Sequence, residues 1–324
     1  MTTVITNPIS NIPVNPKSHS LGWAQVWADR LDADINNKCD DNIHSYEHIA
    51  IDHGVNFSGS LNMFGGANEE VFNKINSVMR HNKITSLDHD MPDYGAIFKK
   101  RLDATSTYSG ITERWCDDVS ARIASIPTLR QEEFSEELSG ITLGDSHTIA
   151  FSRRKDHILR NDGATLYGAL NTGIKNMLRG MEPFGQITLC FGSIDIRHHV
   201  VRNNTNIKKL VAEYVRQGEE LRSKYCTDIR YAAPVPVEWE GRRIPKSGFY
   251  DGTAFYGCAA QRAGITEEFI NALVNEGVPV VMPPYEWYTM DREEYATKHM
   301  ELSSSFHISP AFYRRNNWGK DVHI

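Results

Sequence analysis

Residues 141–147 read Ile-Thr-Leu-Gly-Asp-Ser-His, and the fold prediction starts from this pattern. The apolar run at its start is typical of a short buried strand, and the Gly-Asp-Ser-His that follows is typical of a tight turn. Such a turn exposes the hydroxyl of Ser146 and aims the backbone N–H groups behind it at whatever the hydroxyl attacks. The stretch therefore predicts a strand that ends at a reactive serine.

The chain on either side predicts further short strands that alternate with amphipathic helices. Residues 186–191 (QITLCF), 229–233 and 278–282 have the length and apolarity of buried strands, and we expect another strand at 165–170 (TLYGAL). Apolar residues between 207 and 221 recur at helical spacing, and Thr266 is the predicted cap of a helix over 267–276. This alternation predicts an α/β fold with three layers around a mostly parallel sheet, whose ligands lie at the carboxyl ends of the strands.

The first part of the chain predicts a second α/β lobe. A helix is expected around Trp23 to Leu31 and a strand at 48–51, and an acidic stretch near residue 135 marks the boundary. We therefore expect a lobe over 1–135, with a role in substrate recognition, and a second domain over 136–324. The glycine- and amide-rich loop 52–66 has two interpretations, a site for an anion or sugar hydroxyls and a long turn.

Composition excludes several classes of protein. Of the 324 residues, 40% are hydrophobic and 23% charged, which is typical of a globular protein and excludes a disordered chain. The formal net charge of −6 provides no global basic field for nucleic acid. The N-terminus has no secretory signal pattern, no apolar run is long enough to span a membrane, and the five scattered cysteines are typical of a reducing compartment. These features predict a cytoplasmic protein without a membrane partner.

Three short blocks resemble the SGNH/GDSL hydrolase superfamily. They are LGDSHT at 143–148, FGSIDIRHH at 191–199 and SSFHISP at 304–310, with Gly168 or Gly173 as the glycine of a further block. The resemblance covers about residues 140–315 and implies a domain of SGNH/flavodoxin-like type. It implies that Ser146 is a nucleophile, that His307 is its base, and that backbone N–H groups of Ser146 and of Gly168 or Gly173 hold an oxyanion.

Two positions depart from the family pattern. Ile194 stands where the family has an asparagine that donates to the oxyanion, and Ser304 stands where it has an aspartate three residues before the histidine. Loss of one oxyanion donor typically costs about 10²–10³ in turnover, and neutralising a triad carboxylate costs about 10⁴. Asn171 is a candidate for the missing donor. Candidates for the missing carboxylate are Asp291, Glu293 and Glu301.

Polar residues in the two strand-end loops complete the candidate site. Asp195 is assigned to the catalytic set, and the residues expected to bind substrate are Asp145, His147, Gly192, Arg197 and His199. Asp195 has an alternative role as a cap of its own turn, and Arg197 an alternative role as the ion-pair partner of an aspartate. Because His198 and His199 are adjacent, we expect at most one of them to face the cleft.

The sequence favours one function and leaves two others open. The favoured function is an ester hydrolase or acyltransferase with a Ser-His dyad, acting on a polar, carbohydrate- or nucleotide-like substrate without a cofactor or metal. The first alternative is a metal-dependent phosphoesterase, because the spacing of Asp145 and His147 fits the start of such a motif. The second is a non-catalytic binding module on the same fold, which the replacements at 194 and 304 allow.

Overall fold

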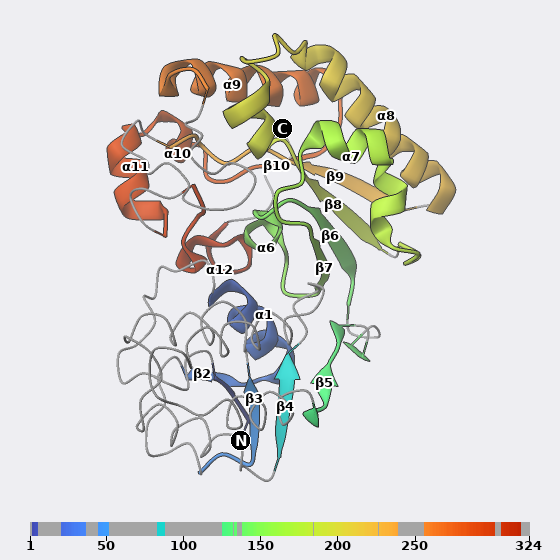
Figure 1. Cartoon of the computed structure of the whole chain (residues 1–324), viewed down its shortest axis with the longest axis vertical. Coiled ribbons are helices and arrows are strands. Elements are labelled where there is room, and N and C mark those ends of the chain that lie inside the picture. The colour runs from blue at the N-terminus through green and yellow to red at the C-terminus, as the bar shows by residue number, and fades with distance from the viewer. Residues whose placement is uncertain are drawn as a thin grey trace, which may run out of the picture. The chain divides into compact units, whose positions relative to one another are not determined.

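The chain divides into two compact units, Met1–Glu136 and Glu137–Ile324. The computed structural model, drawn in Figure 1, describes residues 2–5, 21–36, 45–51, 83–87, 125–131, 133–134, 138–183, 185–225, 227–238, 256–301 and 306–318. The predicted loop 52–66 lies outside the described residues.

The first unit contains a five-stranded parallel sheet. Its strands are β1 (Thr2–Ile5), β2 (Asp34–Asn36), β3 (His48–Ile51), β4 (Ile84–Leu87) and β5 (Thr128–Leu129), in the order β2-β1-β3-β4-β5. Helix α1 (Leu21–Leu31) follows β1, and its Trp23, Val26 and Trp27 are buried. The strand predicted at 48–51 and the helix predicted up to Leu31 are both present.

The second unit contains a second five-stranded parallel sheet. Its strands are β6 (Gly140–Gly144), β7 (Asp156–Arg160), β8 (Gln186–Cys190), β9 (Asp228–Ala232) and β10 (Val280–Val281), in the order β10-β9-β8-β6-β7. Counted within the unit this is the order 2-1-3-4-5, the doubly wound arrangement of flavodoxin-like folds. Helices and helical turns connect the strands: α6 (Thr148–Phe151), α7 (Leu166–Thr172), η3 (Ile174–Leu178), η4 (Asp195–His199), α8 (Ile207–Tyr225), α9 (Ala259–Asn275), α10 (Glu286–Thr289), α11 (Arg292–His299), η5 (Pro310–Phe312) and α12 (Arg314–Asn317). The predicted parallel α/β fold is confirmed.

Two predicted elements are wrong in detail. Residues 165–170 are not a strand, because Thr165 is extended and its side chain accepts the Gly168 N–H, which starts helix α7. A short apolar run alone does not distinguish a strand from a buried helix. Thr266 lies inside α9 rather than at its start, and its hydroxyl donates to the Arg262 carbonyl at 2.9 Å.

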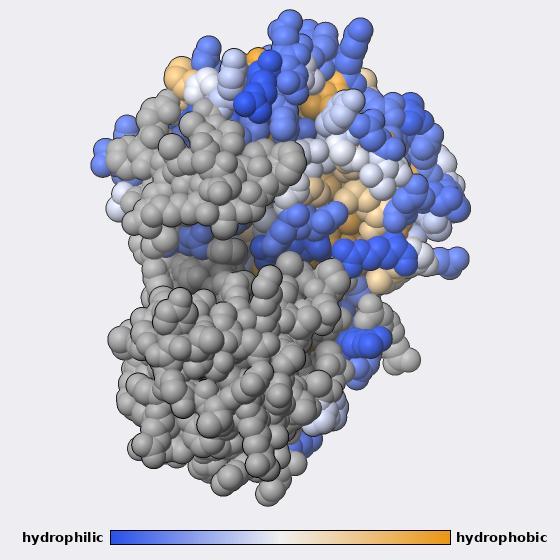
Figure 2. Space-filling view, viewed as in Figure 1, coloured by the Kyte–Doolittle hydropathy of each residue, from blue (hydrophilic) through white to orange (hydrophobic). Residues whose placement is uncertain are grey.

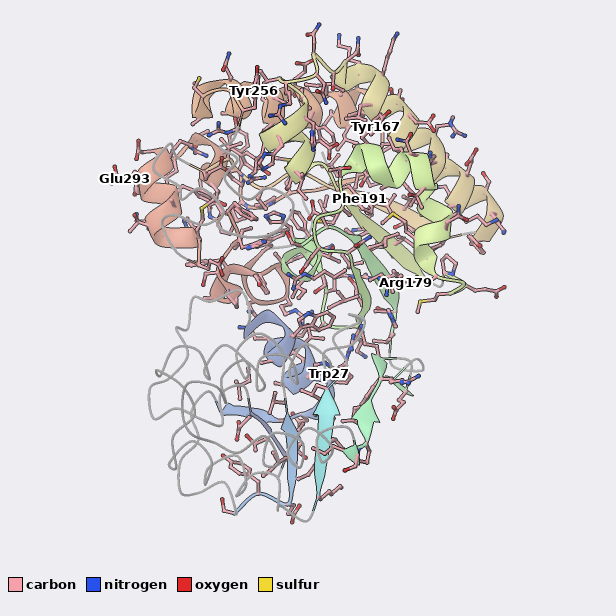
Figure 3. All side chains as sticks on the ribbon, in the orientation of Figure 1. Trp27, Tyr167, Arg179, Phe191, Tyr256 and Glu293 are labelled. Atoms are coloured by element: carbon pink, nitrogen blue, oxygen red, sulfur yellow. The ribbon has the colours of Figure 1, made fainter. Side chains whose placement is uncertain are left out.

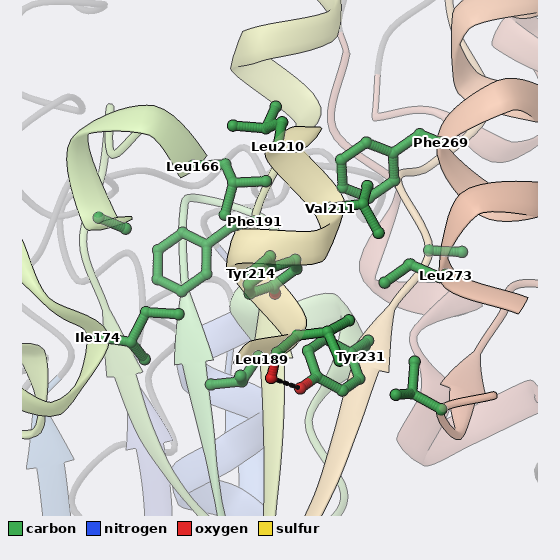
Figure 4. Packing of buried hydrophobic residues seen from close by; sticks show 14 of the residues in the cluster. Leu166, Ile174, Leu189, Phe191, Leu210, Val211, Tyr214, Tyr231, Phe269 and Leu273 are labelled. Atoms are coloured by element: carbon green, nitrogen blue, oxygen red, sulfur yellow. Dashed lines mark hydrogen bonds between the residues drawn. The ribbon is translucent and has the colours of Figure 1, made fainter. Parts of the chain in front are cut away.

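A hydrophobic core joins helices α7, α8 and α9 to one face of the second sheet. The alternation of the strands directs Ile141, Leu143, Ile187 and Leu189 into this core, with each side chain almost completely buried. Tyr231 of β9 belongs to the same core and lies beside Leu189 in Figure 4, with its hydroxyl donating to a carbonyl of α8, that of Val215, at 3.3 Å. The core therefore fixes the three helices relative to the strand ends that carry the candidate site.

The visible described residues of the second unit in Figure 2 are mainly polar. On the face shown in Figure 2, hydrophilic residues cover much of its helices, with smaller hydrophobic areas between them. Among the described residues, no helix combines the length and apolarity needed to cross a bilayer.

A pair of glycine substitutions tests the packing of α8 on β9. A Cβ added to Gly218 would lie 1.9 Å from the buried Tyr231 hydroxyl, whereas a Cβ on Gly264 of α9 would meet no atom within 4 Å. We expect Gly218→Ala to lower the free energy of unfolding by about 1–3 kcal/mol through overpacking. Gly264→Ala should raise it by up to about 1 kcal/mol through helix propensity. Urea denaturation of both variants measures the difference, and equal effects would contradict the packing described.

Candidate active site

The turn with Ser146 begins where β6 runs alongside β8. An added Cβ on Gly144 would lie only 1.9 Å from the Cys190 carbonyl oxygen, so only glycine fits there. The Asp145 N–H donates to that same oxygen at 2.9 Å, and the Thr148 N–H donates back to the Asp145 carbonyl at 3.1 Å. These contacts close the turn and leave the partly exposed Ser146 at the carboxyl edge of the sheet.

His307 reaches this turn from a short antiparallel pairing near the end of the chain. Met300 and Ile308 form the bridge, the Glu301 N–H donates to the His307 carbonyl at 3.0 Å, and the Ser309 N–H donates to the His299 carbonyl at 2.8 Å. We call these paired residues, 299–301 and 307–309, the C-terminal hairpin. Aromatic rings pack around it: Trp287 stacks on the His299 ring at 4.5 Å between centroids.

Ser146 and His307 lie within hydrogen-bonding distance, although 161 positions separate them in the chain. The Ser146 Oγ is 2.9 Å from the His307 Nε2. This distance lies inside the range of about 2.6–3.2 Å required for transfer of a proton between nucleophile and base. The sequence predicted this approach, and the structure contains it.

One of the three candidate carboxylates approaches the other side of the His307 ring. The Glu301 Oε1 lies 3.4 Å from the His307 Nδ1, and both side chains are largely buried. Asp291 instead caps helix α11, because its side chain accepts the N–H groups of Glu293 and Glu294. Glu293 is exposed on the outside of α11, as Figure 3 shows. Ser304 lies outside the described residues.

Asp145 and His147 are turned into the protein. The Asp145 Oδ1 accepts the His147 backbone N–H at 2.9 Å and lies 3.2 Å from the His147 Nδ1. The His147 Nε2 lies 3.0 Å from the Phe306 carbonyl oxygen. With exposed fractions of 1% and 3%, these two side chains contact the turn and the segment before His307 rather than open space.

Asp195, which the sequence assigned to the catalytic set, holds the start of helix α7 instead. Its two carboxylate oxygens accept the backbone N–H groups of Leu166 at 2.6 Å and of Tyr167 at 3.1 Å. Burial raises the pKa of Asp195, while these two N–H groups and nearby His199 act in the opposite direction. The carboxylate therefore caps helix α7, which the sequence did not predict, rather than its own turn.

The predicted oxyanion donors lie on and after α7. The Gly168 N–H is already donated to the Thr165 hydroxyl at 2.9 Å, so it is not available to an oxyanion. Gly173 lies in the wall of a pocket of about 440 Å³ between η3 and α8. Asn171 is exposed on the last turn of α7. The role of Asn171 and Gly173 at the oxyanion stays a prediction.

Two backbone N–H groups at the strand ends are available in their place. Ser146 lies two residues beyond Gly144, and Gly192 lies two residues beyond Cys190, which pairs with Gly144. Within the described part of the chain, neither the Ser146 nor the Gly192 N–H donates to an acceptor. Gly192 has a φ of +109°, a backbone conformation that favours glycine.

Arg197, predicted to bind substrate, is buried in an ion-pair cluster. Its Nε donates to the Glu238 Oε2 at 2.8 Å, and the Arg262 Nε lies 3.1 Å from the other Glu238 oxygen. The Arg197 guanidinium also lies 5.8 Å from the centre of the Phe306 ring. Arg197 therefore supports the segment before His307. The importance of Glu238 was not predicted, although an acid directly after the apolar run 231–237 indicates a buried charge with a partner.

Of the remaining predicted binding residues, His199 is partly exposed and His198 is buried. The expectation that at most one of the two faces the cleft stays a prediction. Among the residues that the structure describes, no three His, Cys, Asp or Glu side chains are grouped to hold a metal ion. The interactions of the His147 nitrogens with Asp145 and Phe306 also leave the Asp145-x-His147 pair without the shared open point that a phosphoesterase metal needs.

No protein-family model matches the chain, and no curated protein matches it. Among solved structures, a protein from Slackia heliotrinireducens described as "a putative SGNH hydrolase" is 14% identical, with 53% of this chain and 90% of that chain covered and a TM-score of 0.37. Two further crystal structures are 12% and 13% identical, with 52% and 55% of this chain and 89% and 93% of theirs covered, and TM-scores of 0.35 and 0.34. The first description names the superfamily that residues 143–148 resemble. At these identities and TM-scores we draw nothing from the likeness about activity.

Removal of the Asp195 carboxylate tests its role as a cap. We expect Asp195→Ala to lower the free energy of unfolding by about 1–3 kcal/mol, because two N–H groups lose their buried acceptor. Asp291→Ala is the matched control, an exposed cap whose loss costs about 1 kcal/mol. Chemical denaturation measures both changes. An unchanged free energy of unfolding in Asp195→Ala would contradict the role of Asp195 as a cap of α7.

Proposed function

We propose that the protein is a serine ester hydrolase or acyltransferase whose reacting groups lie in the second unit. The observation that carries the proposal is the chain of contacts from the Ser146 Oγ through the His307 ring to Glu301, with distances of 2.9 and 3.4 Å. A nucleophile, a base and a carboxylate that orients the base are the parts that acyl transfer requires.

Each step of the reaction is assigned to one of these groups. As the Ser146 Oγ attacks the ester carbonyl carbon, its proton moves to the His307 Nε2. The His307 Nδ1–H then points to Glu301, which fixes the tautomer and stabilises the imidazolium. When the tetrahedral intermediate collapses, the Nε2 proton passes to the leaving alcohol, and an acyl group stays on Ser146. Water or a second alcohol then removes the acyl group by the same sequence of steps, which gives hydrolysis or transfer.

The carbonyl oxygen becomes negative in the intermediate and needs hydrogen-bond donors. The Ser146 and Gly192 N–H groups are the proposed donors, because they lie beyond adjacent strand ends and have no other acceptor in the described part of the chain. Backbone donors are preorganised, so they act without a side-chain amide. They would compensate for the lack of a side-chain donor at Ile194, where the SGNH/GDSL hydrolase superfamily has an asparagine.

The proposed substrate remains a polar, carbohydrate- or nucleotide-like ester. Fewer charged side chains support this substrate class than the sequence implied, because Asp145, Asp195 and Arg197 are buried. Of the polar residues that the sequence assigned to substrate binding, His199 is partly exposed on η4 and is the remaining candidate for a contact with a polar group of the substrate.

Covalent labelling tests the nucleophile. We expect a fluorophosphonate probe to modify Ser146 in the full chain, and mass spectrometry of the digested protein locates the adduct. Ser146→Ala should abolish both labelling and the cleavage of p-nitrophenyl acetate, while the melting temperature changes little because a turn hydroxyl packs against few atoms. Ser139→Ala, an exposed serine at the start of β6, is the control that keeps both.

The result also separates the alternatives. A wild-type protein that is neither labelled nor active on esters would refute the proposal and favour a binding module on this fold. Ester cleavage that survives in Ser146→Ala would show that another group is the nucleophile.

A charge-removing pair tests the carboxylate. We expect Glu301→Gln to lower kcat/KM by about 10²–10⁴, because the imidazolium loses its stabilising charge. Glu293→Gln neutralises an exposed carboxylate on the neighbouring helix and should leave the rate unchanged. Steady-state kinetics on the same ester compares the two. Equal rates in both variants would remove Glu301 from the mechanism.

A further inference from the structure

A second imidazole lies beside the proposed dyad. The centroids of the His147 and His307 rings are 5.1 Å apart. The residues next to the dyad also contact each other, since His147 follows Ser146, Phe306 precedes His307, and the His147 Nε2 lies 3.0 Å from the Phe306 carbonyl oxygen. We call the turn from Asp145 to Thr148 the nucleophile turn. Two adjacent contacts join it to the C-terminal hairpin and to the residue before the hairpin, namely the Ser146–His307 contact and the His147–Phe306 contact.

Both nitrogens of the His147 ring face atoms that accept hydrogen bonds. A backbone carbonyl oxygen only accepts, so the Nε2 opposite Phe306 must carry a proton. The Nδ1 lies 3.2 Å from the Asp145 Oδ1, which already accepts the His147 backbone N–H. A neutral ring with its proton on Nε2 would direct the lone pair of Nδ1 at a carboxylate oxygen.

One additional proton removes this repulsion, and chemistry places it on the ring. Imidazole is a stronger base than carboxylate, so the proton goes to the ring. The other oxygen of Asp145, Oδ2, is buried without a hydrogen-bond partner in the described part of the chain, so a positive charge opposite Oδ1 is the compensation that the carboxylate has there.

We propose that His147 is a positioning residue for the proposed ester chemistry, held as an imidazolium by Asp145 and fastening the segment before His307 to the nucleophile turn. Nδ1–H donates to Asp145 and Nε2–H donates to the Phe306 carbonyl. The fixed positive charge beside His307 makes it harder for His307 to become protonated in the resting enzyme. His307 therefore stays available as a base at lower pH than it would without His147.

The groups around the pair come from several elements. Asp145 shares the turn with His147, and the other titratable or charged groups nearby are His307 and Glu301 on the C-terminal hairpin, Cys190 at the end of β8, Tyr214 of α8 and Arg197 of η4. Burial raises the pKa values of Cys190 and Tyr214, and Asp145 raises them further, so both stay neutral near neutral pH. The charges that bear on His147 at that pH are the carboxylates of Asp145 and Glu301 and the Arg197 guanidinium.

Nitrogen NMR of the full chain tests the protonation directly. With ¹⁵N-labelled histidine, His147 is assigned as the residue whose signals vanish in His147→Gln. At pH 7.5 we expect both of its ring nitrogens to carry protons, and Ser146→Ala should show the same signals because the pair does not depend on turnover. A ring with a proton on Nε2 alone would overturn the inference. Because this readout needs no activity, the inference can fail while the proposed function stands, and the proposed function can fail while His147 is an imidazolium.

Kinetics tests the positioning role. We expect His147→Ala to lower kcat by about 10²-fold, because the contact with the Phe306 carbonyl is lost and the dyad is misplaced. Removal of the nearby positive charge, which leaves the Asp145 carboxylate in place, should also move the acid limb of the kcat/KM profile up by about one pH unit. In His147→Gln the side-chain amide can still donate to Asp145 and to the Phe306 carbonyl, but the positive charge is absent.

His147→Gln separates geometry from charge. We expect it to keep kcat within about tenfold of the wild type, because the contact with Phe306 is retained, while its acid limb lies at the higher pH. An acid limb that does not move in either variant would overturn the electrostatic role. A kcat in His147→Gln as low as in His147→Ala, or an unchanged kcat in His147→Ala, with both folds intact by circular dichroism, would overturn the positioning role.

Discussion

Strands β6 and β8 pair in register from Gly140 with Gln186 to Gly144 with Cys190, and Gly144 allows this pairing to reach the ends of both strands. The two strands are not consecutive, because β7 lies on the outer side of β6. The connections from β6 and β8 therefore leave the sheet in different directions, and a crevice opens at this point in doubly wound folds. Ser146 and Gly192 lie at that position because each follows a paired strand end by two residues.

The C-terminal hairpin brings His307 and Glu301 together, and its register explains how a carboxylate reaches the His307 ring although position 304 is a serine. The pairing of Met300 with Ile308 places Glu301 directly beside His307 on the opposing strand. Glu301 therefore reaches the His307 ring from six residues away in sequence, rather than from the position three residues before the histidine. A carboxylate from a paired strand and a carboxylate from a local turn can serve the same imidazole, since orientation of the ring depends on distance and direction only.

Several charged residues near the strand ends hold the scaffold together instead of facing a substrate. A buried charge is costly unless a partner or several N–H groups compensate it, and the structure supplies such partners at Asp195, Arg197 and Glu238. Asp195 fastens the start of α7, and the Arg197–Glu238–Arg262 cluster joins η4, the chain after β9 and helix α9. Together with the hydrophobic core, these buried polar contacts hold α7, η4 and α9 in place, and Arg197 also contacts the Phe306 ring.

The parallel α/β fold, the serine at the end of β6 and the histidine that approaches it were predicted from the sequence. The fold and the position of the serine follow from local signals, namely apolar runs of strand length and glycines at strand ends, whereas the histidine was assigned from the resemblance to the SGNH/GDSL hydrolase superfamily. It is the folded chain that shows that Glu301 rather than Asp291 or Glu293 faces His307, that the N–H of Gly168 is already bonded, and that Asp195 and Arg197 are buried. These features could not be predicted because a polar side chain takes its role from the partners that folding brings to it, and those partners lie up to 161 positions away in the chain.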